Sequence, residues 1–228
     1  MLDDRSHPTP AALTPGQRDL LQHKIHVDPR ALTQSDANVR RRLSSAWSAA
    51  LRLVAALHGI PEDALHWWAR QPRGHILLTA EDEGYSASLR ASGDRALAAT
   101  ALVPLHRILA QPDHALKLTL QPLDHLLGCD ADPTGAWLSD GGGRTPRWQR
   151  VGGHIATLFP LGYGLSDAGI NDPHWYWAEG LATALRDRRK LNAADPKLER
   201  LLGQSILDDG FWRNFVAEES QDLHNDRK

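Results

Sequence analysis

The chain has 228 residues, of which 41% are hydrophobic and 24% are charged, and its formal net charge at pH 7 is −2. This length and apolar content are enough for one domain with a sizeable core, and the near-neutral charge argues against a broad basic surface for nucleic acid. The single cysteine, Cys129, excludes an internal disulfide and a zinc site built on cysteines, and it fits a reduced compartment.

The first residues, MLDDRSHPTPAAL, contain two aspartates and two prolines, and they lack the basic start and the apolar run of a signal peptide. We expect residues 1–12 to form a flexible tail. The chain has no stretch of 18 apolar residues, so we expect no membrane partner and a cytoplasmic location.

The next part of the chain, residues 13–110, is predicted to be mainly helical. Thr14, followed by a proline, predicts the start of a helix that runs to about residue 26. Ser35 or Asp36 is expected to cap a longer helix to about residue 58, because apolar residues recur there at steps of three and four and a glycine follows.

A short helix from Pro61 to about residue 70 comes next in the prediction. Residues 75–80 and 85–90 read as two strands, and the sequence EDEG between them is typical of a turn, so we expect a β-hairpin over about 74–91. A further helix is expected after Asp94 up to about residue 110, with a break where Pro104 falls within it.

The last part of the chain, residues 111–228, is predicted to consist of helices joined by long loops. The expected helices span about 113–128, 146–159, a segment that opens at Asp172 and Pro173, 195–204 and 208–219. The predicted fold class is therefore α+β and predominantly helical, with one small β element.

The segment DPHWYWAEGLATALRDRR contains a single glutamate, Glu179, inside an apolar and aromatic helix. Glu179 is adjacent to Ala178 and three residues before Ala182, so it borders the apolar face of this helix. One interpretation is a glutamate at the rim of that face, paired with Arg186 or Arg188, because buried carboxylates are uncommon unless they are paired.

The other interpretation is a metal ligand. Zinc peptidases of the HExxH type carry two histidines at positions i and i+4 of one helix, with a glutamate after the first as general base. In the segment TLQPLDHLLG, His125 fits the second histidine of such a motif. Gln121 then stands at the first histidine and Pro122 at the general base.

These two segments together resemble the catalytic domain of the anthrax lethal factor-like zinc metallopeptidases. The second motif of that family is similar to YWAEGL, residues 176–181, and its tail is similar to Asp195-Pro196-Lys197-Leu198. The resemblance covers roughly residues 113–204, and it implies a zincin-like C-terminal part. It also implies that His125 and Glu179 are the positions of two zinc ligands.

Two departures from the family pattern limit what this resemblance implies. The neutral amide of Gln121 is a poor ligand for zinc, and Pro122 can neither accept a proton nor polarise water. A general base contributes about 10²–10⁴ to the rate, so its loss alone is severe. His154 is a possible third ligand, and Tyr163 is a possible catalytic residue that would stabilise an oxyanion.

Aromatic residues give a further expectation about function. Four tryptophans are clustered in sequence around the presumed site, and tryptophan is favoured at interfaces, so they are the predicted binding residues: Trp137, Trp148, Trp175 and Trp177. The sequence thus predicts a non-catalytic, metallopeptidase-like pseudo-enzyme that needs no cofactor and binds a peptide or protein partner.

Two alternatives remain open on the sequence. One is an active zinc metallopeptidase with an atypical ligand set, which would bind Zn²⁺. The other is a DNA-associated regulator that uses the helical region 36–73. In either metallopeptidase-like case we expect the side chains of His125 and Glu179 to face each other, joined by a hydrogen bond or an ion pair if no metal is bound.

Overall fold

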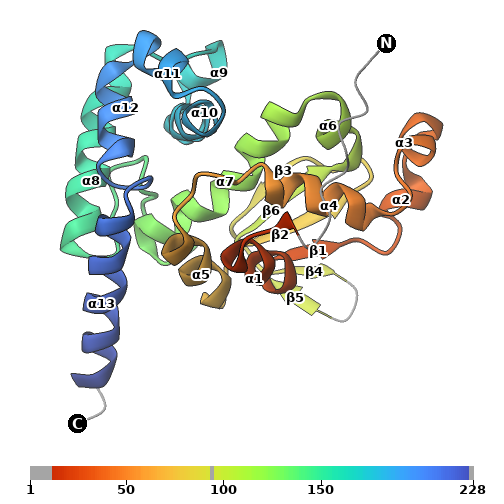
Figure 1. Ribbon diagram of the computed structural model, residues 1–228, viewed down its shortest axis with the longest axis horizontal. Coiled ribbons are helices and arrows are strands. Elements are labelled where there is room, and N and C mark those ends of the chain that lie inside the picture. The colour runs from red at the N-terminus through yellow and green to blue at the C-terminus, as the bar shows by residue number, and fades with distance from the viewer. Residues whose placement is uncertain (1–11, 93–94, 226–228) are drawn as a thin grey trace.

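The computed structural model describes residues 12–92 and 95–225 (Figure 1). Its first half holds five helices and all of the described strands. They are α1 (Pro15–His23), β1 (Ile25–Val27), α2 (Ala31–Gln34), α3 (Ala37–Arg42), α4 (Ala46–Ala55), α5 (Glu62–Arg70), β2 (His75–Thr79), β3 (Gly84–Ser86), β4 (Arg90–Ser92), β5 (Arg95–Leu97) and β6 (Thr100–Pro104).

The second half is helical over the described residues. Its elements are α6 (Leu105–Ala110), α7 (Pro112–Cys129), α8 (Pro146–Leu158), the short 3₁₀ helix η2 (Phe159–Leu161), α9 (Asp167–Asn171), α10 (Pro173–Arg186), α11 (Arg188–Ala194), α12 (Pro196–Gly203) and α13 (Asp209–Asn225). The expected fold class, α+β and predominantly helical, is confirmed.

The main sheet has four strands in the order β1-β2-β6-β3. The first three are parallel, and β3 runs antiparallel to β6 at the edge of the sheet. Ile76 lies beside Ala101 and Leu78 beside Val103 in the β2–β6 register, and all four side chains belong to the main hydrophobic core. Since side chains alternate along a strand, their neighbours Leu77 and Leu102 lie on the opposite face.

The opposite face of the sheet is covered by the β4–β5 hairpin. Leu77, Leu102 and the hairpin's Leu97 are all buried there, at 2%, 7% and 3% exposure. Arg95 of the hairpin donates a hydrogen bond to Nδ1 of His26 on β1, at 3.4 Å. The sheet is therefore covered on both faces, which explains why β6 is buried along its whole length.

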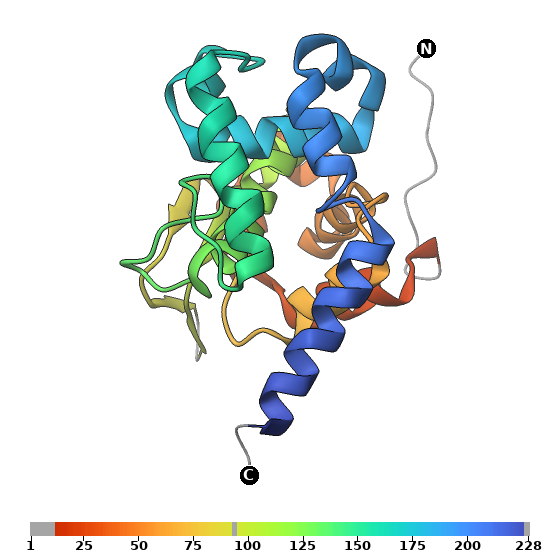
Figure 2. The ribbon, with the colours of Figure 1, turned by 90° about the vertical axis from the view of Figure 1, so that its left-hand side faces the viewer.

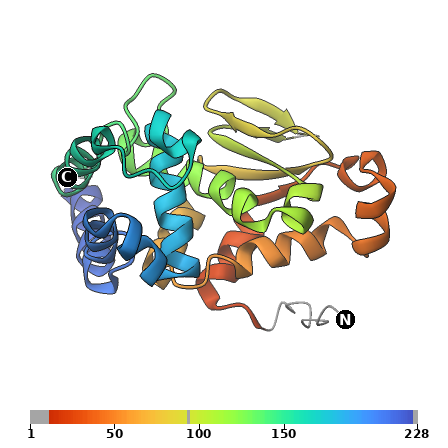
Figure 3. The same cartoon turned by 90° about the horizontal axis from the view of Figure 1, so that it is seen from above.

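Helix α7 connects the sheet to the C-terminal helices. It packs against β6, β3, α10 and α8, and it crosses the middle of the molecule (Figures 1 and 3). Figure 2 shows α8 and α12 side by side, with α13 continuing away from them. One continuous cluster of buried hydrophobic residues runs from Leu13 to Phe215, so the two halves share a core.

Aromatic rings tie α13 to the rest of this core. Trp148 of α8 packs against Trp212 and Phe215, with ring centroids 5.2 and 5.6 Å apart. Trp67 of α5 lies 5.6 Å from Trp212 and donates a hydrogen bond to Glu219 at 2.8 Å. No helix in the described ranges is long and apolar enough to cross a membrane.

The predicted helix starts agree well with the structure, but two helices of the first half differ from their predictions. The expected helix over 36–58 is divided into α3 and α4, because Ser45 forms a capping box with Ser48 and starts a new helix. The helix expected from Asp94 to about residue 110 is wrong before Pro104, where residues 95–97 and 100–104 are strands, and confirmed after it, where α6 spans Leu105–Ala110.

The predicted hairpin over about 74–91 is also wrong. β2 and β3 both pair with β6, which lies between them, and they do not pair with each other. The expected flexible tail, residues 1–12, lies almost wholly outside the described residues.

Helix α5, which lies in the region 36–73 considered for DNA binding, is packed into the core. α5 packs against α1 and α13. Its Trp67 and Trp68 are 4% and 0% exposed, so this helix belongs to the core. A recognition helix has to be accessible along one face in order to reach base edges.

Candidate functional site

The candidate site is built around the C-terminal end of α7. The helix starts with Pro112 at its first position and continues through Pro122, which has no N–H to donate. It ends at Cys129, because Asp130 and Ala131 both have positive φ angles, 60° and 56°. These two residues turn the chain back over the last turn of α7.

His125, in that last turn, uses both of its ring nitrogens. Nε2 lies 2.8 Å from the carbonyl oxygen of Asp132, which can only accept, so Nε2 carries the proton. Nδ1 then accepts a hydrogen bond from the Tyr85 hydroxyl, at 2.6 Å. Burial lowers the pKa of His125, so the neutral form is favoured. A metal could ligate this ring only if one of these bonds were broken.

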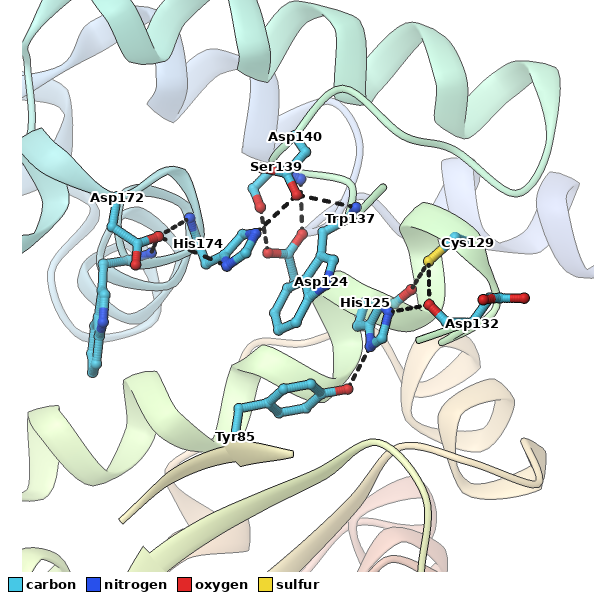
Figure 4. Close-up of polar contacts among 11 residues, drawn as sticks. Tyr85, Asp124, His125, Cys129, Asp132, Trp137, Ser139, Asp140, Asp172 and His174 are labelled. Carbon is cyan, nitrogen blue, oxygen red and sulfur yellow. Dashed lines mark hydrogen bonds and ion pairs between the residues drawn. The ribbon is translucent and has the colours of Figure 1, made fainter. Parts of the chain in front are cut away.

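Trp137 lies between two histidine rings, and we call His125, Trp137 and His174 the His–Trp stack (Figure 4). The indole is 4.5 Å from the His125 ring and 4.0 Å from the His174 ring, each inclined by 14°. Tyr85 meets Trp137 edge-on at 4.7 Å. The stack therefore joins β3, α7, the loop of residues 130–145 and the first turn of α10.

The loop of residues 130–145 is anchored to α7 by Asp124. This fully buried carboxylate accepts hydrogen bonds from the Ser139 hydroxyl at 2.6 Å and from the Ser139 amide at 2.9 Å. Gly128 allows the loop to lie directly on the helix, because a Cβ there would collide with the backbone of Trp137 and Leu138. The loop is thus a fixed part of the site.

Asp124 is also the most unusual acid of the site. Burial raises its pKa to about 7, although both Ser139 hydrogen bonds and the nearby His174 act in the opposite direction. Its neighbour His174 is itself paired with Asp140, with 2.9 Å between Nε2 and Oδ2. Asp124 thus titrates near neutral pH in the folded protein.

Helix α10 brings Glu179 into the interior from the other side. Asp172 caps this helix by accepting from the amides of His174 and Trp175, as the Asp-Pro pair predicts. Glu179 is 2% exposed, and its Oε1 accepts from Nζ of Lys117 at 2.5 Å and from the Ser166 hydroxyl at 2.6 Å. Its Oε2 is buried, finds no hydrogen-bond partner among the described residues and lies against Gly169.

The expectation that His125 and Glu179 face each other is wrong. Glu179 meets Lys117, which precedes His125 by eight residues, or roughly 12 Å along the helix axis. His125 meets Tyr85 and Asp132. The alternative of a rim glutamate paired with Arg186 or Arg188 is wrong as well, because those arginines pair with Asp113 and Glu199.

The other two predicted site residues, His154 and Tyr163, contact neither His125 nor Glu179 in the structure. His154 is exposed on α8 and lines a pocket of about 250 Å³ with Lys197 and Arg200 of α12. Tyr163 is 44% exposed on the loop between η2 and α9, and no hydrogen bond or ring contact of its side chain is found among the described residues. The structure thus brings neither residue to His125.

The four predicted binding tryptophans divide into two pairs. Trp137 is half-buried in the His–Trp stack, and Trp175 is half-buried with its ring 5.3 Å from that of His114. Trp148 and Trp177 are 0% exposed, so the prediction that they line a binding surface is wrong. They belong to the apolar core, which a partner cannot reach.

The residues of the implied zinc site do not fit a zinc ion. Zinc in a catalytic site takes three protein ligands and keeps one open position. Over residues 12–92 and 95–225, no three His, Cys, Asp or Glu side chains are grouped so that they could hold a metal. Glu179 already neighbours an ammonium group, and both nitrogens of His125 are used.

Comparisons with protein families, with curated proteins and with solved structures find no significant match to this chain. The resemblance to lethal factor-like peptidases therefore rests on the quoted sequence segments. One of them has a local explanation in the structure. Asp195 caps α12 and accepts a hydrogen bond from Tyr176, so the Asp-Pro pair and the tyrosine of YWAEGL act together in packing.

Sequence reasoning missed the residues that hold the two candidate ligands. Lys117 and Tyr85 are the direct partners of Glu179 and His125, and Asp124 with Ser139 fixes the loop. Lys117 lies four residues before Gln121 and so shares a helix face with it, but this spacing does not say which turn of α7 meets Glu179.

We predict that Lys117→Met lowers the free energy of unfolding by about 3 kcal/mol, because it leaves the buried Glu179 carboxylate without its cation. This loss of stability is at the lower end of the range for breaking a buried ion pair, since Lys117 is 22% exposed. Urea denaturation measures the change. The double variant Lys117→Met/Glu179→Gln removes both charges and should lose less than the single variant. Equal losses would show that the charge pair is not the cause.

We predict that Asp124 makes the protein less stable as the pH rises from 5 to 8. Its folded pKa of about 7 lies above the ordinary value of 3.8, so the stability that its protonated form provides is lost through pH 7. Relative to Asp124→Asn, the wild-type protein should lose about 2 kcal/mol over this range. Urea denaturation at each pH measures the difference, and parallel pH profiles would contradict the assignment.

Proposed function

We propose that this chain is a metallopeptidase-like protein without catalytic activity, which binds a peptide or protein partner. The observation that carries the proposal is the Lys117–Glu179 ion pair at the position where the resemblance implies a metal ligand. An ammonium group at 2.5 Å from the carboxylate competes directly with a metal ion for the same oxygen.

The absence of a base supports the same proposal. A metal-activated hydrolysis needs a group that takes the proton of water, and Pro122 at the expected position cannot do so. His125 donates to a carbonyl and accepts from Tyr85, so it supports the structure of the site. The alternative of an active zinc peptidase would require these contacts to be rearranged.

The edge strand β3 supports a peptide as partner. β3 pairs with β6 on one side and is the last strand of the sheet on the other, and an extended peptide can add to such an edge through main-chain hydrogen bonds. Tyr85 of β3 contacts Trp137, and Glu83 beside β3 pairs with His114, which stacks on Trp175. Two half-buried tryptophans therefore lie near this edge.

We also propose that the protein is cytoplasmic. The support is the single cysteine, because a chain with one cysteine forms no internal disulfide and fits a reduced compartment. Fractionation of cells that produce the full chain tests this, and recovery with a membrane or exported fraction would contradict it.

The binding proposal predicts that random peptides displayed on phage are enriched by the purified full chain. An enriched peptide, measured by fluorescence anisotropy, should bind Trp175→Ala or Trp137→Ala about 30-fold more weakly, because truncation of a central aromatic residue costs about 2 kcal/mol. Trp47→Ala is the matched control: its indole is 50% exposed on α4, and its loss should leave binding unchanged.

Three results would contradict the proposal. No peptide is enriched, or the Trp47 control weakens binding as much as the other two variants, or the enriched peptide is hydrolysed when zinc is added. The last result would favour the active peptidase. Thermal unfolding of each variant separates a loss of binding from a loss of folded protein.

A further inference from the structure

An HExxH-type spacing on α7 can also be counted from Lys117, the residue that Glu179 contacts. Counted in this way, which we call the 117–121 frame, its positions are held by Lys117, Leu118 and Gln121. Lys117 and Gln121 are separated by four residues, so both occupy one face of the helix, one turn apart. Between them, directly after Lys117, stands Leu118, which is 1% exposed. The motif read from residue 117 is therefore Lys-Leu-x-x-Gln, and it begins at the residue that meets Glu179.

The buried polar atoms around this pair are incompletely satisfied. Over residues 12–92 and 95–225, Oε2 of Glu179 and Oε1 of Gln121 are both buried without a hydrogen-bond partner. An orphaned carboxylate oxygen on a residue paired with an ammonium group, and an orphaned amide oxygen one turn further along α7, describe a site arranged for positive charge, since carbonyl and carboxylate oxygens are satisfied by donors or by cations. In the described part of the chain, Lys117 is the one cation bonded to Glu179.

A zinc site of the helical type has the same arrangement with different residues. It takes two histidines at i and i+4 of one helix and a carboxylate from a second helix, and the metal supplies the positive charge. Here the two helical positions are 117 and 121, the second helix is α10 and the carboxylate is Glu179. A flexible four-carbon chain brings the ammonium of Lys117 between the helices.

We propose that the Lys117 ammonium takes the place of a metal ion between α7 and α10, in a frame that starts at residue 117 and not at residue 121. The inference rests on the proposed non-catalytic function and explains it: the two ligand positions hold lysine and glutamine, and the position of the base holds a buried leucine. The protein therefore keeps its α7–α10 contact at any concentration of metal.

The competing frame, residues 121–125, makes a different prediction. It uses His125, whose nitrogens are bonded to Tyr85 and Asp132 and which lies two turns from the residue that Glu179 meets. Gln121→Ala would not separate the two frames. Introducing histidine at position 121 separates them, because this position belongs to both frames. Its second ligand on α7 would be residue 117 in one frame and the native His125 in the other.

The experiment compares Lys117→His/Gln121→His with Gln121→His, both as the full chain. After dialysis with zinc, the double variant should retain about one zinc ion per chain and, with Co²⁺, show the visible absorption of a tetrahedral site. Gln121→His and the wild-type protein should retain none. Adding Glu179→Ala to the double variant should weaken zinc binding by more than about 100-fold, since it removes a ligand.

Zinc retention by Gln121→His alone would overturn the proposal in favour of the 121–125 frame. A folded double variant that binds no zinc, or that binds it equally well without Glu179, would overturn it too. These readouts are independent of partner binding, so a failure here and a failure of the peptide selection can be told apart.

A second measurement applies if the double variant does not fold. Lys117→Ala should unfold at a lower temperature than the wild-type protein, and ethylammonium chloride should restore part of the loss by supplying the missing ammonium group. Tetramethylammonium chloride at the same ionic strength has no N–H to donate and should not. Equal effects of the two salts, or no effect of either, would contradict the role of Lys117 as the internal cation.

Discussion

The charge of Glu179 has to be neutralised inside the protein, and this constraint determines how α7, α9 and α10 meet. Removing a carboxylate from water costs several kcal/mol, which only a close cation and further donors can offset. Lys117 from α7 and Ser166 at the start of α9 provide them at 2.5 and 2.6 Å. Oε1 of Glu179 thus accepts hydrogen bonds from two segments that are more than forty residues apart in the chain.

The position of α10 in turn places the His–Trp stack. Once Glu179 is fixed, the first turn of the same helix holds His174 over Trp137, and the indole reaches His125 on its other face. Ring contacts of this kind contribute about 0.5–1.5 kcal/mol each beyond their burial. With Asp124 holding Ser139, the loop of residues 130–145 is fixed at its centre, so Trp137 is already in place before any partner arrives.

The sequence was informative where the chemistry is local. Thr14, Pro61 and Asp172 mark helix starts through caps and prolines, and each marks one in the structure. The Lys117–Glu179 pair could not be predicted, because nothing in either segment says which turn of α7 lies under α10. His125 was expected to be the partner of Glu179 because of its residue type. The true partner, Lys117, is determined by where α7 and α10 cross.

The strands show the same limit in another way. Strands were predicted over residues 75–80 and 85–90, where the structure has β2 (75–79) and the shorter β3 (84–86), but they were paired with each other, since a turn between them is the simplest local solution. Their real partner, β6, was expected to be a helix, because short strands carry little periodicity. Pairing in a sheet depends on the whole set of strands, and an error in one strand misplaces its neighbours.

The edge strand β3 has a consequence for how the molecule behaves among copies of itself. With only three residues, Gly84–Ser86, it presents few unpaired main-chain groups, and long exposed edges are the ones that start sheet-to-sheet aggregation. The parallel strands β1, β2 and β6 are followed at this side of the sheet by β3, whose open edge is too short to pair with another copy over more than a few residues. Most of the selectivity of any segment that joins β3 must therefore come from side chains.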